Sequence, residues 1–113
     1  MMTDWNDYMT QIGDRVGEFS KLAPATVKAF GALDRAAEQG GHLDAKTREL
    51  IALAVAVTTR CDGCITVHTS NAIKAGATRE EIAEALSVAI ALNAGAALVY
   101  SMRVLDAHAA KTA

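Results

Sequence analysis

The sequence predicts an all-α fold of about six helices, folded as one domain over residues 1–113. Hydrophobic residues make up 51% of the chain, aromatic residues only 4%, and there is a single proline. This composition favours helices that pack closely through small side chains. No segment shows the alternation of polar and apolar residues that is typical of a half-buried strand. The length suits one domain rather than two.

The first two helices are predicted before residue 40. Apolar residues recur at helical spacing over residues 5–22, although two glycines weaken that helix. Pro24 then suits the first turn of a second helix, because its fixed backbone angle matches the helix. The Gly40–Gly41 pair ends this second helix.

The third predicted helix is the central one. Asp44 is a favourable N-cap for a helix over residues 45–59, and the run Leu50–Val57 is apolar on every face. The chain should therefore bury this helix among the others. After a break near Arg60, a fourth helix is expected to begin at Cys61 and to end at about Lys74.

Two further helices complete the prediction. Thr78 and Glu81 have the spacing of a capping box, which opens a fifth helix. Gly95 favours a kink or a short break there, followed by a last helix over residues 96–109.

Both cysteines lie at the start of the fourth helix, together with a histidine. Cys61 and Cys64 are three residues apart, and His68 follows Cys64 by four, so the three side chains share one helical face. A helix N-terminus stabilises a thiolate, which is the reactive form of cysteine, and a nearby histidine can accept the thiol proton. Two cysteines at this spacing can also close a disulfide. The pattern therefore predicts thiol redox chemistry.

Glu49 is the fourth candidate residue. It directly precedes the apolar run of the third helix, and a carboxylate buried there would need a polar partner. Pairing with His68, directly or through water, would orient the imidazole. Lys46 and Arg48 are alternative, more ordinary partners.

The spacing of these four residues resembles a known family. Glu49, eleven residues, Cys61-x-x-Cys64, three residues and His68 form the signature of the alkylhydroperoxidase D-like branch of the carboxymuconolactone decarboxylase superfamily. The resemblance extends from Pro24 to the C-terminal helix. It implies the all-helical fold of those proteins, assembled as homotrimers or hexamers. No bound cofactor or metal is expected.

The resemblance also implies an activity and a role for each residue. It implies reduction of alkyl hydroperoxides, with Cys64 as the peroxidatic thiol and Cys61 as the resolving thiol. Glu49 and His68 would form the proton relay. A dithiol donor, either a lipoylated protein or a thioredoxin-like protein, would reduce the resulting disulfide. The best-known peroxidase of the family has a histidine just before its second cysteine, where this chain has Gly63.

Other functions are compatible with the same residues. Cys61, Cys64 and His68 could bind zinc, with Glu49, His42 or a neighbouring subunit as the fourth ligand. The protein would then be a non-enzymatic helical oligomer that binds zinc or a small ligand. It could also act on another substrate, with the dithiol as a sensor. The related decarboxylases lack the cysteine pair, so decarboxylation is not expected.

Charge and hydropathy limit the kinds of binding partner and the location that can be expected for this protein. The net charge is −2 and no run of Lys or Arg occurs, so no nucleic-acid partner is expected. The acidic start is unlike a secretory signal, and Glu84, Ser87 and Asn93 interrupt the longest apolar stretch, residues 82–100. We therefore expect a cytoplasmic protein without a membrane segment. A mean hydropathy of +0.16 suggests that apolar surface is buried between subunits.

Overall fold

The computed structural model describes all 113 residues and contains five helices and no strand. Their bounds are α1 Trp5–Leu22, α2 Pro24–Glu38, α3 Ala45–Thr59, α4 Asp62–Lys74 and α5 Arg79–Thr112. The predicted all-α class is therefore confirmed. The helix count is five rather than about six, because α5 runs through Gly95 without the expected break.

The helix starts follow the local signals in the sequence. The carboxylate of Asp44 accepts a hydrogen bond from the Thr47 N–H at 2.8 Å, which caps α3. Thr78 and Glu81 form the reciprocal capping box of α5. Each cap satisfies backbone N–H groups that have no partner inside the helix. Pro24 lies in the first turn of α2, as expected.

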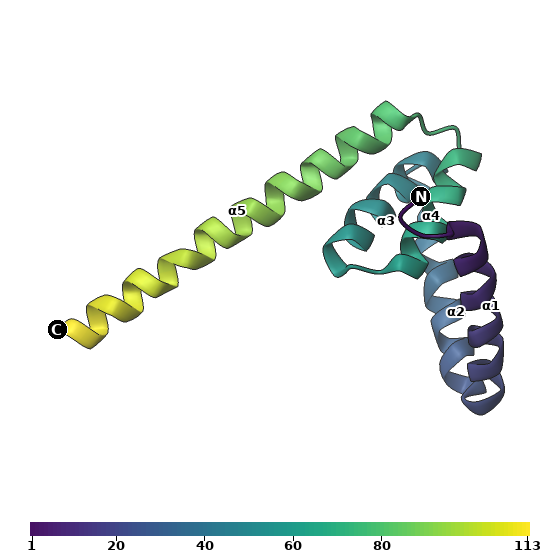
Figure 1. Ribbon diagram of the computed structural model, residues 1–113, viewed down its shortest axis with the longest axis horizontal. Coiled ribbons are helices and arrows are strands. Elements are labelled where there is room, and N and C mark those ends of the chain that lie inside the picture. Colours follow the sequence, from purple (N-terminus) through teal and green to yellow (C-terminus); the bar gives the residue numbers. More distant parts are fainter.

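The helix α3 is the centre of the packing. It contacts α4 on one side and the first part of α5 on the other, while α1 packs on α4 (Figure 1). The few buried side chains lie where these helices meet: Leu53, Ala56, Thr66, Ala72 and Ala89. Other apolar residues of α3, such as Ile51 and Val55, are about half exposed (49% and 55%). The expected burial of α3 is therefore restricted to one of its faces within a single chain.

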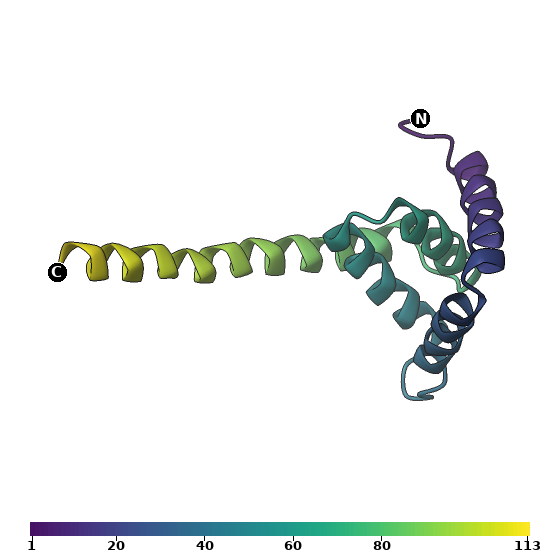
Figure 2. The ribbon, with the colours of Figure 1, turned by 90° about the horizontal axis from the view of Figure 1, so that it is seen from below.

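The outer parts of the chain extend away from this centre. The helices α1 and α2 contact each other at a sharp corner at Ala23, and the distal part of α5 projects in another direction to the C-terminus (Figure 2). The radius of gyration is 18.6 Å, whereas a globular chain of this length has about 13 Å. A single subunit is thus much less compact than an independent domain.

The projecting part of α5 is apolar. Its large exposed side chains include Leu98, Val99, Tyr100, Val104 and Leu105, each at least 65% exposed. By length and composition α5 could cross a membrane, and only 6% of its most apolar window is buried. The interruptions noted in the sequence do not prevent it from meeting that criterion. The same criterion is met by core helices of soluble proteins.

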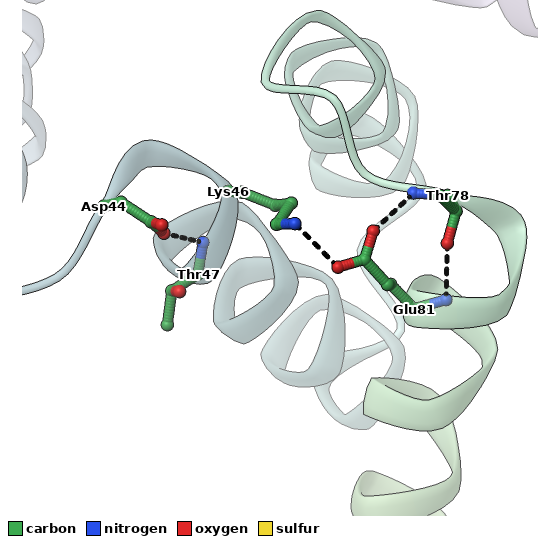
Figure 3. Close-up of polar contacts among 5 residues, drawn as sticks. All are labelled: Asp44, Lys46, Thr47, Thr78 and Glu81. Carbon is green, nitrogen blue, oxygen red and sulfur yellow. Dashed lines mark hydrogen bonds and ion pairs between the residues drawn. The ribbon is translucent and has the colours of Figure 1, made fainter.

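An ion pair joins the beginnings of α3 and α5. The Lys46 Nζ lies 2.7 Å from a carboxylate oxygen of Glu81, while the other oxygen of Glu81 accepts from the Thr78 N–H (Figure 3). The hydrogen bond from Lys46 lowers the pKa of Glu81, and Glu81 in turn raises the pKa of Lys46. Lys46 therefore pairs with Glu81 and is not the partner of Glu49.

Candidate active site

The cysteines lie at the junction between α3 and α4 and are joined by a disulfide, with their Cα atoms 5.2 Å apart. Cys61 is the N-cap of α4, and its Sγ accepts a hydrogen bond from the Cys64 N–H at 3.1 Å. Both residues are partly buried. Cys61 therefore occupies the position where a helix N-terminus best stabilises negative charge on sulfur.

Arg60 makes the turn that places Cys61 there. It is the C-cap of α3 and has left-handed backbone angles, φ 54° and ψ 50°. It is the only residue other than glycine with a positive φ. The chain reverses direction here, and the Cys61 N–H bonds back to the Ala56 carbonyl at 3.0 Å.

Glu49 and His68 are in direct contact. The His68 Nδ1 lies 2.7 Å from Glu49 Oε2, and the two side chains are 29% and 16% exposed. An ionised carboxylate only accepts hydrogen bonds, so Nδ1 carries the proton and donates it to this bond. In the neutral ring Nε2 is then the unprotonated nitrogen, which can act as a base.

This pair lies one helical turn from the disulfide. Cys64 and His68 are separated by four residues of the same helix, which places their Cβ atoms about 5–6 Å apart. Glu49 reaches the histidine from α3. The arrangement can therefore remove a proton from, or return it to, a group reacting at Cys64.

The helix α1 covers the other side of this helix start. A Cβ atom on Gly63 would lie 3.8 Å from the Ile12 side chain, in ordinary van der Waals contact. One turn further along α4, the buried Thr66 hydroxyl donates to the Trp5 carbonyl at 3.1 Å. A long side chain at position 63 would therefore have to share space with α1.

A pocket opens beside the Glu49–His68 pair, with a volume of about 390 Å³. Its wall combines apolar and polar side chains from α2, α3, α4 and the loop between α2 and α3: Asp34, Ala37, Glu38, Leu43, Arg48, Glu49, Ile51, Ala52 and His68. The volume is in the range of small-molecule sites. The Glu49–His68 pair is thus accessible from a partly apolar space.

The structure brings together two of the predicted pairs, Cys61 with Cys64 and Glu49 with His68, and places Cys64 and His68 on neighbouring turns of α4. His42 is exposed in the loop before α3. No cluster of three His, Cys, Asp or Glu side chains is arranged to hold a metal ion.

Two neighbours of the cysteine pair were not singled out from the sequence. Arg60 was recognised only as the place of a helix break, since arginine gives no signal for a left-handed residue. Ile12 belongs to an ordinary apolar stripe, and its position opposite Gly63 is a contact between distant parts of the chain. No local pattern in the sequence predicts such a contact.

These features define a small all-helical protein with a Cys-x-x-Cys disulfide at a helix start and a carboxylate–histidine pair beside it. Residues 24–107 match the carboxymuconolactone decarboxylase family, and the chain belongs to that family. The match begins at the first residue of α2 and so leaves α1 outside it. The family includes decarboxylases and peroxidases.

Relatives and solved structures agree with this assignment. A protein from Haemophilus influenzae is 53% identical over 113 residues, covering all of both chains, and one from Cupriavidus necator is 39% identical over 93% of each. Neither carries an assigned function. The crystal structure of an apo carboxymuconolactone decarboxylase family protein from Legionella pneumophila is similar, with a TM-score of 0.74 and 37% identity. That similarity covers 90% of this chain and 91% of the other.

Proposed function

We propose that this protein is a thiol-dependent oxidoreductase that reduces alkyl hydroperoxides by a dithiol–disulfide cycle. The observation that carries the proposal is the 2.7 Å hydrogen bond between Glu49 and His68, one turn from the Cys61–Cys64 disulfide. A structural disulfide has no need of a neighbouring base. A thiol that must lose and return protons during turnover does.

In the first step His68 Nε2 takes the proton of Cys64, and the thiolate attacks the outer oxygen of the hydroperoxide. The S–O bond forms, the O–O bond breaks, and the departing alkoxide receives the proton from His68 and leaves as the alcohol. Cys64 becomes a sulfenic acid. Glu49 keeps the ring in the required tautomer and stabilises its charged form.

In the second step the Cys61 sulfur attacks the sulfenic acid. The S–S bond forms, the S–O bond breaks, and the hydroxyl group leaves as water after taking up one proton, which balances the proton that the Cys61 thiol loses. A dithiol donor then restores both thiols by two thiol–disulfide exchanges and is itself oxidised to a disulfide. We propose a lipoylated or thioredoxin-like protein as this donor. The cytoplasm, where thiols are kept reduced, is the compartment that suits the cycle.

The test is to mix the reduced protein with cumene hydroperoxide and to count thiols. The wild-type protein should lose two thiols for each alcohol formed. Cys61→Ser should lose one thiol and leave a sulfenic acid that dimedone traps. Cys64→Ser should lose none, and peroxide consumption by this variant at the wild-type rate would refute the assignment of the attacking thiol.

We also propose that the active form is a homo-oligomer, a trimer or a hexamer. Only five of the 113 residues are buried in one chain, and the distal part of α5 is an exposed apolar helix. An isolated helix gains most of its stability from packing, so this segment requires a cover. Sedimentation in detergent-free buffer should show the oligomer, and an 11.8 kDa species at micromolar concentration would contradict it.

The pocket beside Glu49 supports a second candidate function, which is binding of a small ligand without chemistry. A lining that combines apolar and polar side chains is a feature of ligand sites in general. Retention of both thiols after exposure to peroxide would favour this function. Stoichiometric zinc in the reduced protein would favour its metal-binding form.

A further inference from the structure

Arg60 adopts a backbone conformation that side-chain-bearing residues avoid. With φ 54° it lies in the left-handed region, where glycine and asparagine are the usual residues. Non-glycine residues held in this region cluster at functional sites. The arginine side chain is exposed and has no hydrogen bond or ion pair. Neither packing nor pairing therefore accounts for an arginine at this position.

Cys61, which follows Arg60, is the cysteine whose sulfur accepts a backbone hydrogen bond that would stabilise a negative charge. The Cys61 Sγ accepts the Cys64 N–H at 3.1 Å and caps α4. The bond to a sulfur that carries a charge is stronger than the bond to a neutral sulfur. This backbone group serves Cys61 alone, whereas the histidine base lies one turn beyond Cys64.

The charged groups around Cys61 are few. On α4 they are Asp62, which is exposed in the first turn, and His68, which is bonded to Glu49. On α3 the only charged residue near this end is Arg60 itself. The negative charge of Asp62 opposes a thiolate on Cys61, whereas the positive charge of Arg60 favours it. Arg60 therefore offsets the effect of Asp62 on Cys61.

The helices that pack nearby carry few charged residues near Cys61. On α1 the nearest along the face of Ile12 is Arg15, one turn further on, which forms an ion pair with Glu18 at 2.9 Å. Ile12 is the residue of α1 placed over Gly63. The packing side of α5 brings Asn93 to Thr58, and its nearest charged residues along the helix, Glu84 and Arg103, are more than two turns away.

We propose that Arg60 is a positioning residue that, together with the Cys64 N–H, holds Cys61 as the thiolate of the reduced pair. The two cysteines are then activated separately, Cys61 by this fixed charge and Cys64 by the mobile proton of His68. The place of this thiolate in the cycle rests on the proposed function. It is the group that attacks the Cys64 sulfenic acid, and it leaves as a thiolate when the donor attacks Cys64.

The experiment measures the alkylation rate of Cys61 against pH in the reduced Cys64→Ser variant, which keeps the backbone N–H at position 64. The titration midpoint should lie at least one pH unit below that of a free cysteine, about 8.5. Arg60→Gly in the same background should raise the midpoint by about half a pH unit, and Arg60→Lys should restore it. Asp62→Asn should lower it further.

The proposal would be overturned if Cys61 in Cys64→Ser titrated like a free cysteine. It would also be overturned if the titration midpoint of Cys61 were the same with arginine and with glycine at position 60. Circular dichroism of each variant confirms that the helices are retained, and Arg60→Lys shows whether charge rather than shape is responsible. Alkylation involves no peroxide, so its result is independent of whether the protein reduces hydroperoxides. An active peroxidase with an ordinary Cys61 would refute this inference alone.

Discussion

The role of Glu49 can be tested by removing its bond to His68. Glu49→Ala deletes the carboxylate that accepts from Nδ1 at 2.7 Å and is only 16% exposed, so solvent screens the interaction weakly. A hydrogen bond to a charged group contributes about 1.5–3 kcal/mol. If this bond is fully made in the transition state, its loss slows peroxide reduction by about 10- to 150-fold.

The assay is the second-order rate constant for thiol loss after the reduced protein is mixed with cumene hydroperoxide at pH 7. Glu49→Gln keeps a hydrogen-bond acceptor without the charge and should lie between the wild type and Glu49→Ala. Glu38→Ala is the matched control, because Glu38 lines the same pocket without bonding to His68. A Glu49→Ala rate within threefold of the wild type would refute the relay.

Three further predictions concern stability. Leu53→Ala removes a side chain that is 3% exposed and should cost about 2–5 kcal/mol in the free energy of unfolding measured with urea; a cost below about 1 kcal/mol would contradict the central place of α3. Arg60→Gly removes the strain of a left-handed non-glycine residue and should raise the free energy of unfolding by about 0.5–1 kcal/mol, seen as a higher unfolding temperature. Arg60→Ala should give no such increase. Glu81→Gln keeps the capping box but removes the ion pair with Lys46. The pKa of Glu81 is lowered in the folded chain, so its contribution is present above the ordinary glutamate value, about 4.3, and is lost as the pH falls through the lowered value. The difference in unfolding temperature between pH 7 and pH 3 should therefore shrink in Glu81→Gln, and an unchanged difference would exclude the pair as a source of acid sensitivity.

The local signals in the sequence were sufficient for most helix boundaries. Asp44, Pro24 and the Thr78–Glu81 capping box lie where they were expected, because caps depend on residues within one turn of each other. Gly95 was the exception. One glycine costs about 1 kcal/mol in a helix, which is too little to interrupt 34 residues of otherwise good helix formers.

One of the two side-chain ion pairs between helices could be predicted from the sequence, and the other could not. The pairing of Glu49 with His68 was predicted, because a carboxylate beside an apolar run needs a partner and the motif supplies one. The pairing of Lys46 with Glu81 was not, since the two residues are brought together only when α5 packs on α3. Helical periodicity describes one helix at a time and does not predict which ends of two helices meet.

The position of the disulfide decides how the fold responds to reduction. The bridge joins residues three apart within one helix start, so it closes a loop of only a few residues. By the loop-entropy relation such a short loop restrains the unfolded chain by about 2 kcal/mol, compared with almost 5 kcal/mol for a loop of 100 residues. The caps of α3 and α5, the Lys46–Glu81 pair and the contacts of α3 do not involve the bridge. The bond can therefore open and close while most of the contacts that hold the helices together stay in place.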